Sequence, residues 1–151
     1  MSDLLIDAAK KIAPIEAVFE VCDDDDVQAI EAKAGFKLPT TYVSFLKTYG
    51  RCMFAGEATV RCPGEMPPLR IDTMFGCGDS AGNILTDMQR HPEYRNNGLV
   101  PIADDNFNNR YVLRKTGEVM FIDYSRGITS INKIADSFDA FLAMLDVRTL
   151  S

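Results

Sequence analysis

The sequence predicts a single α+β domain with a mainly antiparallel or mixed sheet, covered by helices from the N-terminal part and by one C-terminal helix. Apolar residues recur at helical spacing in two early segments and in one late segment, whereas the segments between them are short apolar runs bounded by glycine and proline. The chain of 151 residues is 46% hydrophobic and has no internal repeat or low-complexity linker. We therefore expect residues 1–151 to form one domain.

Two N-terminal segments have helix signatures. Residues 23–35 begin with four aspartates and end at Gly35, which suits a left-handed terminal residue. Their apolar face consists of Val27, Ile30 and Ala34. Residues 39–50 begin with Pro-Thr and also end at a glycine, as a second helix would. Its core-facing stripe is Tyr42, Phe45, Leu46 and Tyr49.

Two further helices are predicted. The third helix should be capped by Asp79 or Ser80 and should end where His91 precedes a proline. The closing helix should lie within residues 135–147, with Asp136 or Ser137 as its cap. Its apolar stripe is Phe138, Phe141, Leu142 and Leu145.

Strands are predicted between these helices. Residues 57–62 and 69–75 are strand-like, and residues 99–103 follow an Asn-Gly turn. Residues 110–114 and 118–123 flank a short Lys-Thr-Gly connection and should pair as an antiparallel hairpin. Because successive positions of this hairpin are apolar, we expect both of its faces to be covered.

The formal net charge of −6 comes from one acidic segment. Residues 12–32 contain no Lys or Arg, and their acids are Glu16, Glu20, Asp23, Asp24, Asp25, Asp26 and Glu31. Nucleic-acid affinity depends on Lys and Arg, so we predict no nucleic-acid binding and an attraction to basic proteins. Helix capping accounts for one or two of the four consecutive aspartates, and the surplus suggests a cation or a basic partner.

The cysteines and the N-terminus predict a cytoplasmic protein. Cys22, Cys52, Cys62 and Cys77 lack the two-residue spacing of zinc or thiol–disulfide sites, so we expect free thiols in a reducing cytosol. No segment approaches the roughly 18 apolar residues of a membrane span. Asp3 and Asp7 interrupt the N-terminal apolar run, which is unlike a secretory signal.

No catalytic set is evident. His91 is the chain's one histidine, and its place before a proline at a predicted helix end favours a cap over a general base. The glycines of "FGCGDSAGN" lack the lysine of a phosphate-binding loop, and their spacing is too long for the dinucleotide fingerprint. Nothing favours a Cys–His dyad. We predict that the protein is not an enzyme and has no cofactor.

The polar run "DDNFNN" at residues 104–109 precedes the predicted hairpin. Asp104, Asn106 and Asn108 alternate as calcium ligands would, but Asn109 replaces the required glycine and Lys115 replaces the bidentate glutamate. We therefore predict no metal here.

Turn formation accounts for most of this run, since Asp and Asn hydrogen-bond their own backbone. Adjacent Asp104 and Asp105 should point in different directions, which disfavours paired-carboxylate catalysis. Phe107 is either a core residue, which we expect, or a partner contact.

Three stretches occur in the order of one known family's motifs. "IEAKAGFKLPTTYVSFLKTYG" resembles its opening signature, "IADDNFNNRYVL" followed by "GEVMFID" its central hairpin, and "IADSFDAFLAML" its closing helix. The family is the SUKH superfamily, which groups bacterial immunity proteins of polymorphic toxin systems with fungal cell-wall assembly regulators of the Smi/Knr type. The similar runs span about residues 30–50 and 100–145. The chain departs from the pattern at Asn108-Asn109, where Gly-Asn is frequent, and at Arg51-Cys52, where a further glycine is common.

The resemblance implies a non-enzymatic domain that binds and neutralises a cognate toxin protein. An acidic chain suits a basic toxin, for which a nuclease is one candidate. We predict that the partner contacts are Asp23, Asp24, Asp25, Asp26, Asp104, Asp105 and Phe107. Two alternatives remain open at this point: a regulatory scaffold like the fungal relatives, and a small-ligand-binding protein that uses a cleft near residues 75–83.

Overall fold

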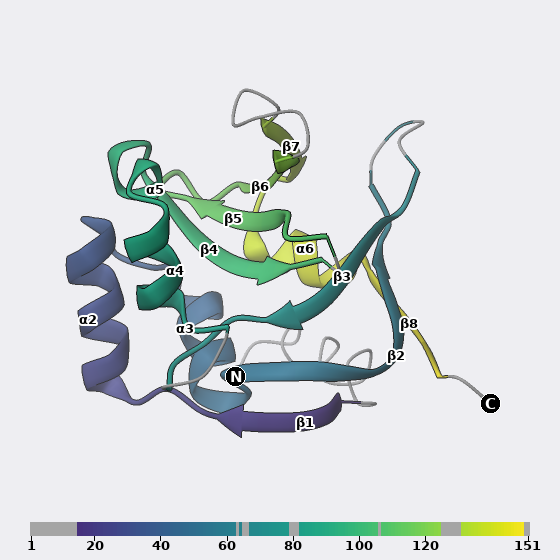
Figure 1. Ribbon diagram of the computed structural model, residues 1–151, viewed down its shortest axis with the longest axis horizontal. Helices are drawn as coiled ribbons and strands as arrows, with labels where there is room; N and C mark the ends of the chain where they lie inside the picture. Colours follow the sequence, from purple (N-terminus) through teal and green to yellow (C-terminus); the bar gives the residue numbers. More distant parts are fainter. Residues whose placement is uncertain are drawn as a thin grey trace.

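The computed structural model describes residues 15–62, 64, 67–78, 82–105, 107–124 and 131–149 (Figure 1). These residues form one antiparallel sheet of eight strands and five helices, which confirms the predicted α+β class. The strands are β1 (Ile15–Glu20), β2 (Arg51–Val60), β3 (Leu69–Met74), β4 (Leu99–Asp104), β5 (Arg110–Arg114), β6 (Val119–Ile122), β7 (Ile131–Ala135) and β8 (Leu145–Thr149). The helices are α2 (Asp24–Ala34), α3 (Thr40–Thr48), α4 (Ile84–Arg90), α5 (Glu93–Asn96) and α6 (Phe138–Ala143).

The strands follow their chain order across the sheet from β1 to β7, and β8 returns to pair with β2. Strand β2 therefore has three partners. Its first half pairs with β1, its second half pairs with β8, and β3 pairs along its other edge. The predicted β5–β6 hairpin is present, with Tyr111 opposite Phe121 and Leu113 opposite Val119. No helix of the described residues is long and apolar enough to cross a membrane.

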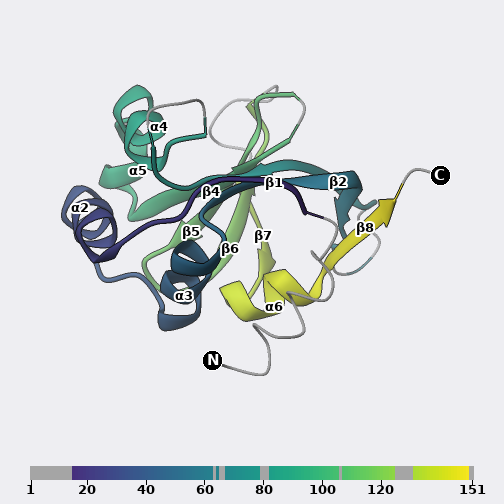
Figure 2. The same ribbon diagram turned by 90° about the horizontal axis from the view of Figure 1, so that it is seen from below.

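The helices form two groups. Helices α3 and α6 contact each other on one face of the sheet (Figure 2). Helices α2, α4 and α5 gather at one side of the molecule, where α4 and α5 both contact β4. The chain thus places α4 and α5 beside the β4–β5 hairpin, and this arrangement creates the site described below.

The ends of α2 confirm the sequence prediction. Asp23 accepts the backbone N–H of Asp26 at 2.8 Å, and Asp26 accepts the backbone N–H of Asp23 at 3.0 Å. This reciprocal capping box satisfies two backbone donors that a helix start would otherwise leave free. The helix ends at Gly35, whose φ of 85° is left-handed, as expected.

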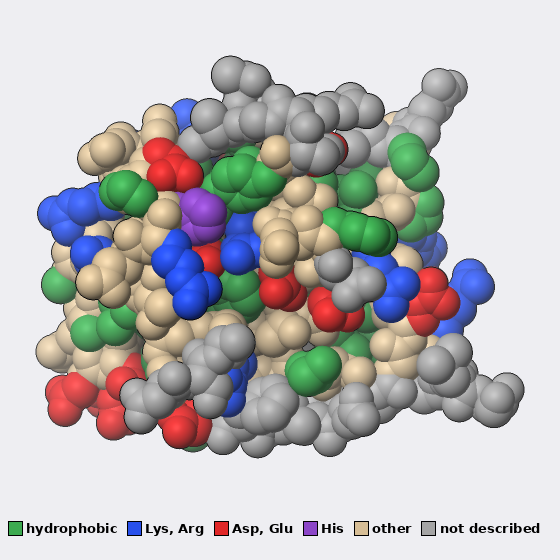
Figure 3. Space-filling model, viewed as in Figure 1, with side chains coloured by type: hydrophobic (Ala, Val, Ile, Leu, Met, Phe, Trp, Pro, Cys, Tyr) green, Lys and Arg blue, Asp and Glu red, His purple; other side chains and the backbone are tan. Residues whose placement is uncertain are grey.

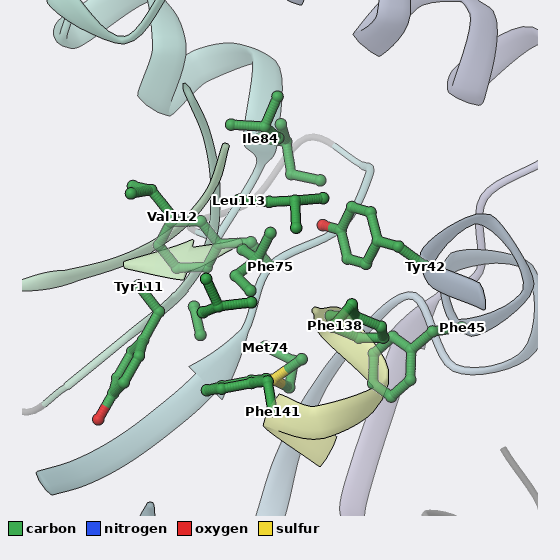
Figure 4. Packing of buried hydrophobic residues seen from close by; sticks show 14 of the residues in the cluster. Tyr42, Phe45, Met74, Phe75, Ile84, Tyr111, Val112, Leu113, Phe138 and Phe141 are labelled. Carbon is green, nitrogen blue, oxygen red and sulfur yellow. The ribbon is translucent and has the colours of Figure 1, made fainter. Parts of the chain in front are cut away.

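The core is rich in aromatic rings. The predicted stripe of α3 points inward, and Tyr42 and Phe45 pack on Phe138 of α6 with ring centroids 4.8 and 5.5 Å apart (Figure 4). Phe141 of the same helix packs on Tyr111 of β5 at 5.5 Å. The two helices and the sheet therefore share one hydrophobic core.

The third predicted helix begins later than the sequence suggested. Helix α4 starts at Ile84 and is capped by Asn83, whose side chain accepts the backbone N–H of Thr86 at 3.0 Å. The predicted caps Asp79 and Ser80 lie outside the described residues. A parallel bridge between Gly76 and Asn83 fixes the extended backbone directly before the helix. The predicted end at His91 is confirmed, because its backbone N–H donates to Asp87 O.

The closing helix is shorter than predicted. Helix α6 is capped by Ser137, as expected, but it ends at Ala143, and Leu145 begins β8. Leu145 is buried, as its apolar character suggested, but it is paired with Val60 of β2. The prediction of a helical Leu145 was wrong because a distant strand supplies the hydrogen bonds that end the helix. Strands β1, β7 and β8 and the short helix α5 were not predicted either.

Candidate functional site

The β4–β5 loop is built around a buried carboxylate. Asp105 is 8% exposed, and its Oδ1 accepts the backbone N–H groups of Phe107 and Asn109 at 2.7 and 3.0 Å. Its Oδ2 accepts the side-chain amide of Asn109 at 2.9 Å. The carboxylate of Asp105 is therefore used inside the loop, and its role as a partner contact stays a prediction. Asn106 lies outside the described residues.

The loop's amides have the turn role that the sequence favoured. Asn108 has a left-handed φ of 64°, a conformation that Asn tolerates better than most residues. Asn109 Oδ1 accepts the backbone N–H of Tyr124, which follows β6, at 2.8 Å. These bonds tie the loop both to itself and to a neighbouring strand end.

Phe107 stands out from this loop. Its side chain is 72% exposed, so the prediction that it belongs to the core was wrong. The neighbouring core positions are already filled by residues such as Ile102 and Tyr111, and the bond from the Phe107 N–H to Asp105 holds the backbone in the turn. The loop thus presents an aromatic ring to solvent on a hydrogen-bonded frame.

A buried ion pair lies beside this loop. Arg110, the first residue of β5, donates from Nε to Asp87 Oδ2 at 3.0 Å and from Nη2 to Asp87 Oδ1 at 3.1 Å. The side chains of Arg110 and Asp87 are only 11% and 6% exposed. Burial alone would lower the pKa of Arg110, but the hydrogen bonds and charge of Asp87 outweigh it and raise that pKa. The guanidinium also lies over the Phe75 ring, 5.4 Å from its centroid.

Three rings cover this pair. The Tyr124 hydroxyl donates to the Tyr94 hydroxyl at 2.6 Å, and burial raises the pKa of both tyrosines. The His91 ring stacks on Tyr124, with centroids 5.3 Å apart, and its Nδ1 lies 3.3 Å from Glu93 Oε1. We refer to Asp87, His91, Tyr94, Arg110 and Tyr124 as the polar cluster. Figure 3 shows the face on which the histidine, in purple, lies among basic and acidic side chains.

Sequence reasoning missed the polar cluster. Asp87 lies on α4, Arg110 begins β5 and Tyr124 follows β6. These residues are up to 37 positions apart in the sequence and share no motif. Only the packing of α4 and α5 on β4 brings them together. Asp87 and Arg110 pair with each other inside the polar cluster. The evident role of the cluster is therefore to hold α4 against the β4–β5 hairpin.

Asp104 lies at the end of β4 between this cluster and the loop. Its Oδ1 accepts the backbone N–H of Thr73 at 3.2 Å. Burial raises the pKa of Asp104 to about 6, although Arg110 and the Thr73 bond oppose this shift, and nearby Asp72 and Asp105 add to it. Unlike the buried Asp105 of the loop, Asp104 remains partly open to solvent.

The raised pKa of Asp104 predicts a pH dependence of stability. Because the folded state holds the Asp104 proton more tightly than the unfolded state, the free energy of unfolding should fall as the pH rises from about 4 to about 6. One pKa unit corresponds to about 1.4 kcal/mol, but solvent screens this partly exposed group, so we expect a loss of about 1–2 kcal/mol.

The matched variant for this prediction is Asp104→Asn, which keeps an oxygen for the Thr73 N–H. Chemical denaturation of both proteins at several pH values measures the difference. The variant should gain stability relative to the parent across this pH range. Parallel pH curves would contradict the prediction.

The aspartate run forms a separate acidic patch, which we define as Glu20 and Asp23–Asp26. Asp24 pairs with Lys47 of α3, and Asp23 and Asp26 form the capping box. Asp25 has no such intramolecular role in the described structure, and it is exposed. Acidic side chains gather at the lower left of Figure 3, at the N-terminal end of α2. Within the run, Asp23 and Asp26 therefore cap α2, whereas Asp25 contributes exposed negative charge.

The cysteines correct another prediction. Cys22 and Cys77 form a disulfide, with Cα atoms 5.7 Å apart, whereas Cys52 and Cys62 are free. Cys22 lies between β1 and α2, and Cys77 lies between β3 and α4, so the fold joins residues that are 55 positions apart. The prediction of four free thiols was wrong because it considered local spacing alone. Asp26 lies close enough to both cysteines for the three side chains to form a candidate set of metal ligands.

Comparison with known families identifies the chain. The family model described as the SMI1 / KNR4 family (SUKH-1) matches residues 21–144. No curated protein matches the chain. Domains of the matched family generally interact with other proteins. The matched region contains α2, α3, the β4–β5 loop and α6, the elements on which the sequence resemblance rested. Because the match covers most of the sequence, the chain belongs to the SMI1/KNR4 (SUKH-1) family.

Proposed function

We propose that the protein is a cytoplasmic immunity protein that binds a cognate toxin protein and neutralises it by contact, without catalysis of its own. The observation that carries this proposal is the exposed aromatic ring of Phe107 on the hydrogen-bonded β4–β5 loop. Family membership supports a protein-binding role, because such domains generally interact with other proteins.

The loop has the properties of an interface anchor. Aromatic residues carry much of the binding energy at protein interfaces, and a contact surface that is already ordered loses less conformational entropy on binding. Asp105 accepts the backbone N–H groups of both Phe107 and Asn109. The side chain of Asn109 in turn accepts the backbone N–H of Tyr124. The polar cluster then fixes the base of the hairpin against α4.

The acidic patch supports a basic partner. Complementary charge raises the rate of encounter more than it raises the final affinity. With an overall charge of −6, the protein attracts cationic surfaces, and many nuclease domains are cationic because they bind phosphate. We therefore propose a basic toxin, for which a nuclease is the leading candidate.

Co-expression with the protein encoded by the adjacent gene tests this proposal. The toxin domain alone should stop growth, the present chain should restore it, and the two proteins should co-purify. A pair that co-purifies with no toxicity to relieve would favour a regulatory scaffold of the Smi1/Knr4 type. If the protein encoded by the adjacent gene is toxic, remains toxic when the present chain is co-expressed and does not bind this chain, the immunity role is rejected.

Charge reversal tests the acidic patch. The variant Asp24→Lys with Asp25→Lys should slow association with the partner about tenfold at low salt and weaken the salt dependence, because steering by opposite charge is lost. Stopped-flow measurement over a range of salt concentrations gives both quantities.

The matched control is Asp136→Lys with Asp139→Lys, which makes the same charge change at the N-terminal end of α6. This control should slow association less. Equal rates for the two double variants would show that only net charge matters and that the acidic patch has no special place in the encounter.

A further inference from the structure

We propose that Cys22 and Cys77 form a reversible disulfide and that the reduced pair binds Zn²⁺ with Asp26 as a third ligand. This inference does not depend on the proposed immunity role. It assigns a metal site to the junction between the β1–α2 connection and the segment that precedes α4.

The three side chains converge from two parts of the chain. One ligand atom from each of Cys22, Cys77 and Asp26 can be chosen so that all three lie within 4.8 Å of one another. Tetrahedral zinc has bonds of about 2.0–2.3 Å to oxygen and sulfur, which places ligand atoms roughly 3.4–3.8 Å apart. Small side-chain rotations after the sulfurs separate would therefore form the site. Two thiolates and a carboxylate are a donor set that zinc accepts.

The surrounding backbone is already ordered. The Cys22 N–H donates to Leu46 O at 3.0 Å, which ties this residue to α3. On the other side, the Gly76 N–H donates to Gly82 O at 3.0 Å, and the Ile84 N–H donates to Gly76 O at 2.9 Å. These bonds hold the segment that carries Cys77 independently of the disulfide. Reduction should thus leave both thiols near their present positions.

The Asp26 carboxylate is held by a hydrogen bond of its own. Its Oδ2 accepts the Asp23 N–H at 3.0 Å, which fixes the carboxylate and leaves Oδ1 for a metal. Hydrogen bonds of this kind to a ligating carboxylate commonly position it and tune its affinity. The capping box therefore supplies the outer hydrogen bond of the proposed site.

A cavity of about 340 Å³ adjoins Asp26 and Cys77, two of the three proposed ligands. Its lining includes Glu20, Asp26, Cys77 and Asn83. The Glu20 carboxylate lies over Gly78, since a Cβ built on that glycine would be 2.5 Å from Glu20 Oε2. Glu20 or a water in this cavity can provide the fourth ligand, and the cavity gives the ion a path from solvent.

The chemistry requires a dithiol reductant. Two electrons and two protons from that reductant break the S–S bond and produce two protein thiols, while the reductant becomes a disulfide. Zn²⁺ then displaces the two thiol protons and forms two Zn–S bonds. In the oxidised protein neither sulfur can become a thiolate, so the metal loses two of its ligands.

Cobalt substitution in the full-length protein tests the proposal. After reduction and removal of the reductant, one equivalent of Co²⁺ should give thiolate charge-transfer bands and the visible bands of tetrahedral cobalt, and Zn²⁺ should remove both. The disulfide form, verified by intact mass, should bind at least about 100-fold more weakly. A reduced, folded protein without these bands, or an oxidised protein with them, would overturn the proposal.

Variants locate the site. Asp26→Asn keeps an oxygen for the Asp23 N–H and should weaken zinc binding about tenfold or more in a chelator competition assay. Cys62→Ser is the matched control and should leave affinity unchanged, since Cys62 lies outside the set. Burial raises the pKa of Cys52 to about 12, so this thiol competes little for metal. Bands that survive Cys22→Ser with Cys77→Ser, or an unchanged affinity in Asp26→Asn, would refute this ligand set.

Discussion

Replacing Asp87 with alanine should lower the free energy of unfolding by about 3–5 kcal/mol, because the change leaves the Arg110 guanidinium buried without its charge partner. Asp87 supplies both oxygens of the bidentate pair, at 3.0 and 3.1 Å, and both side chains are almost fully enclosed. Urea denaturation at neutral pH measures the loss.

A second variant separates the buried charge from the packing. Asp87→Ala combined with Arg110→Met removes the stranded charge and should recover most of the lost stability, since buried ion pairs can often be replaced by apolar residues at little cost. The exposed pair between Lys133 and Asp136 is the comparison, and Asp136→Ala should have a much smaller effect. Equal losses in the single and double variants would show that the charge pair is not the cause.

Phe107→Ala should weaken binding to the partner by about 30-fold or more while folding stability stays within about 0.5 kcal/mol of the parent. The two expectations follow from one observation. A ring that is 72% exposed contributes little to the core, and an exposed aromatic on an ordered loop is suited to fill a pocket of another protein. Calorimetric titration with the toxin domain and urea denaturation provide the two measurements.

Two controls make this result specific. Val21 is the other large hydrophobic residue that is exposed in the described part of the chain, at 51%, and Val21→Ala should change affinity much less. Phe138→Ala, in the core of α6, should instead cost about 3–5 kcal/mol of stability. If Phe107→Ala left affinity unchanged with a confirmed partner, the β4–β5 loop would not be the anchor of the interface.

The candidate site was only partly predictable. The amide-rich run predicted a turn, and the structure shows one, because Asp105 accepts the backbone N–H groups of Phe107 and Asn109 and Asn108 adopts a left-handed φ. Whether Phe107 turned inward depended on space elsewhere in the core, which no local pattern records. The Asp87–Arg110 pair could not be predicted, since an ion pair between α4 and β5 requires the packing of that helix on the sheet.

The sequence by itself determined the features that depend on neighbouring residues. These are the capped helix α2, the inward stripe of α3, the β5–β6 hairpin and the turn before it, where hydrogen bonds and periodicity act over a few positions. Only the tertiary structure decided the Cys22–Cys77 disulfide, the end of α6 at β8, and the exposure of Phe107. Each of these depends on segments brought together over long stretches of chain, where contact is set by the packing of helices and strands around a shared core.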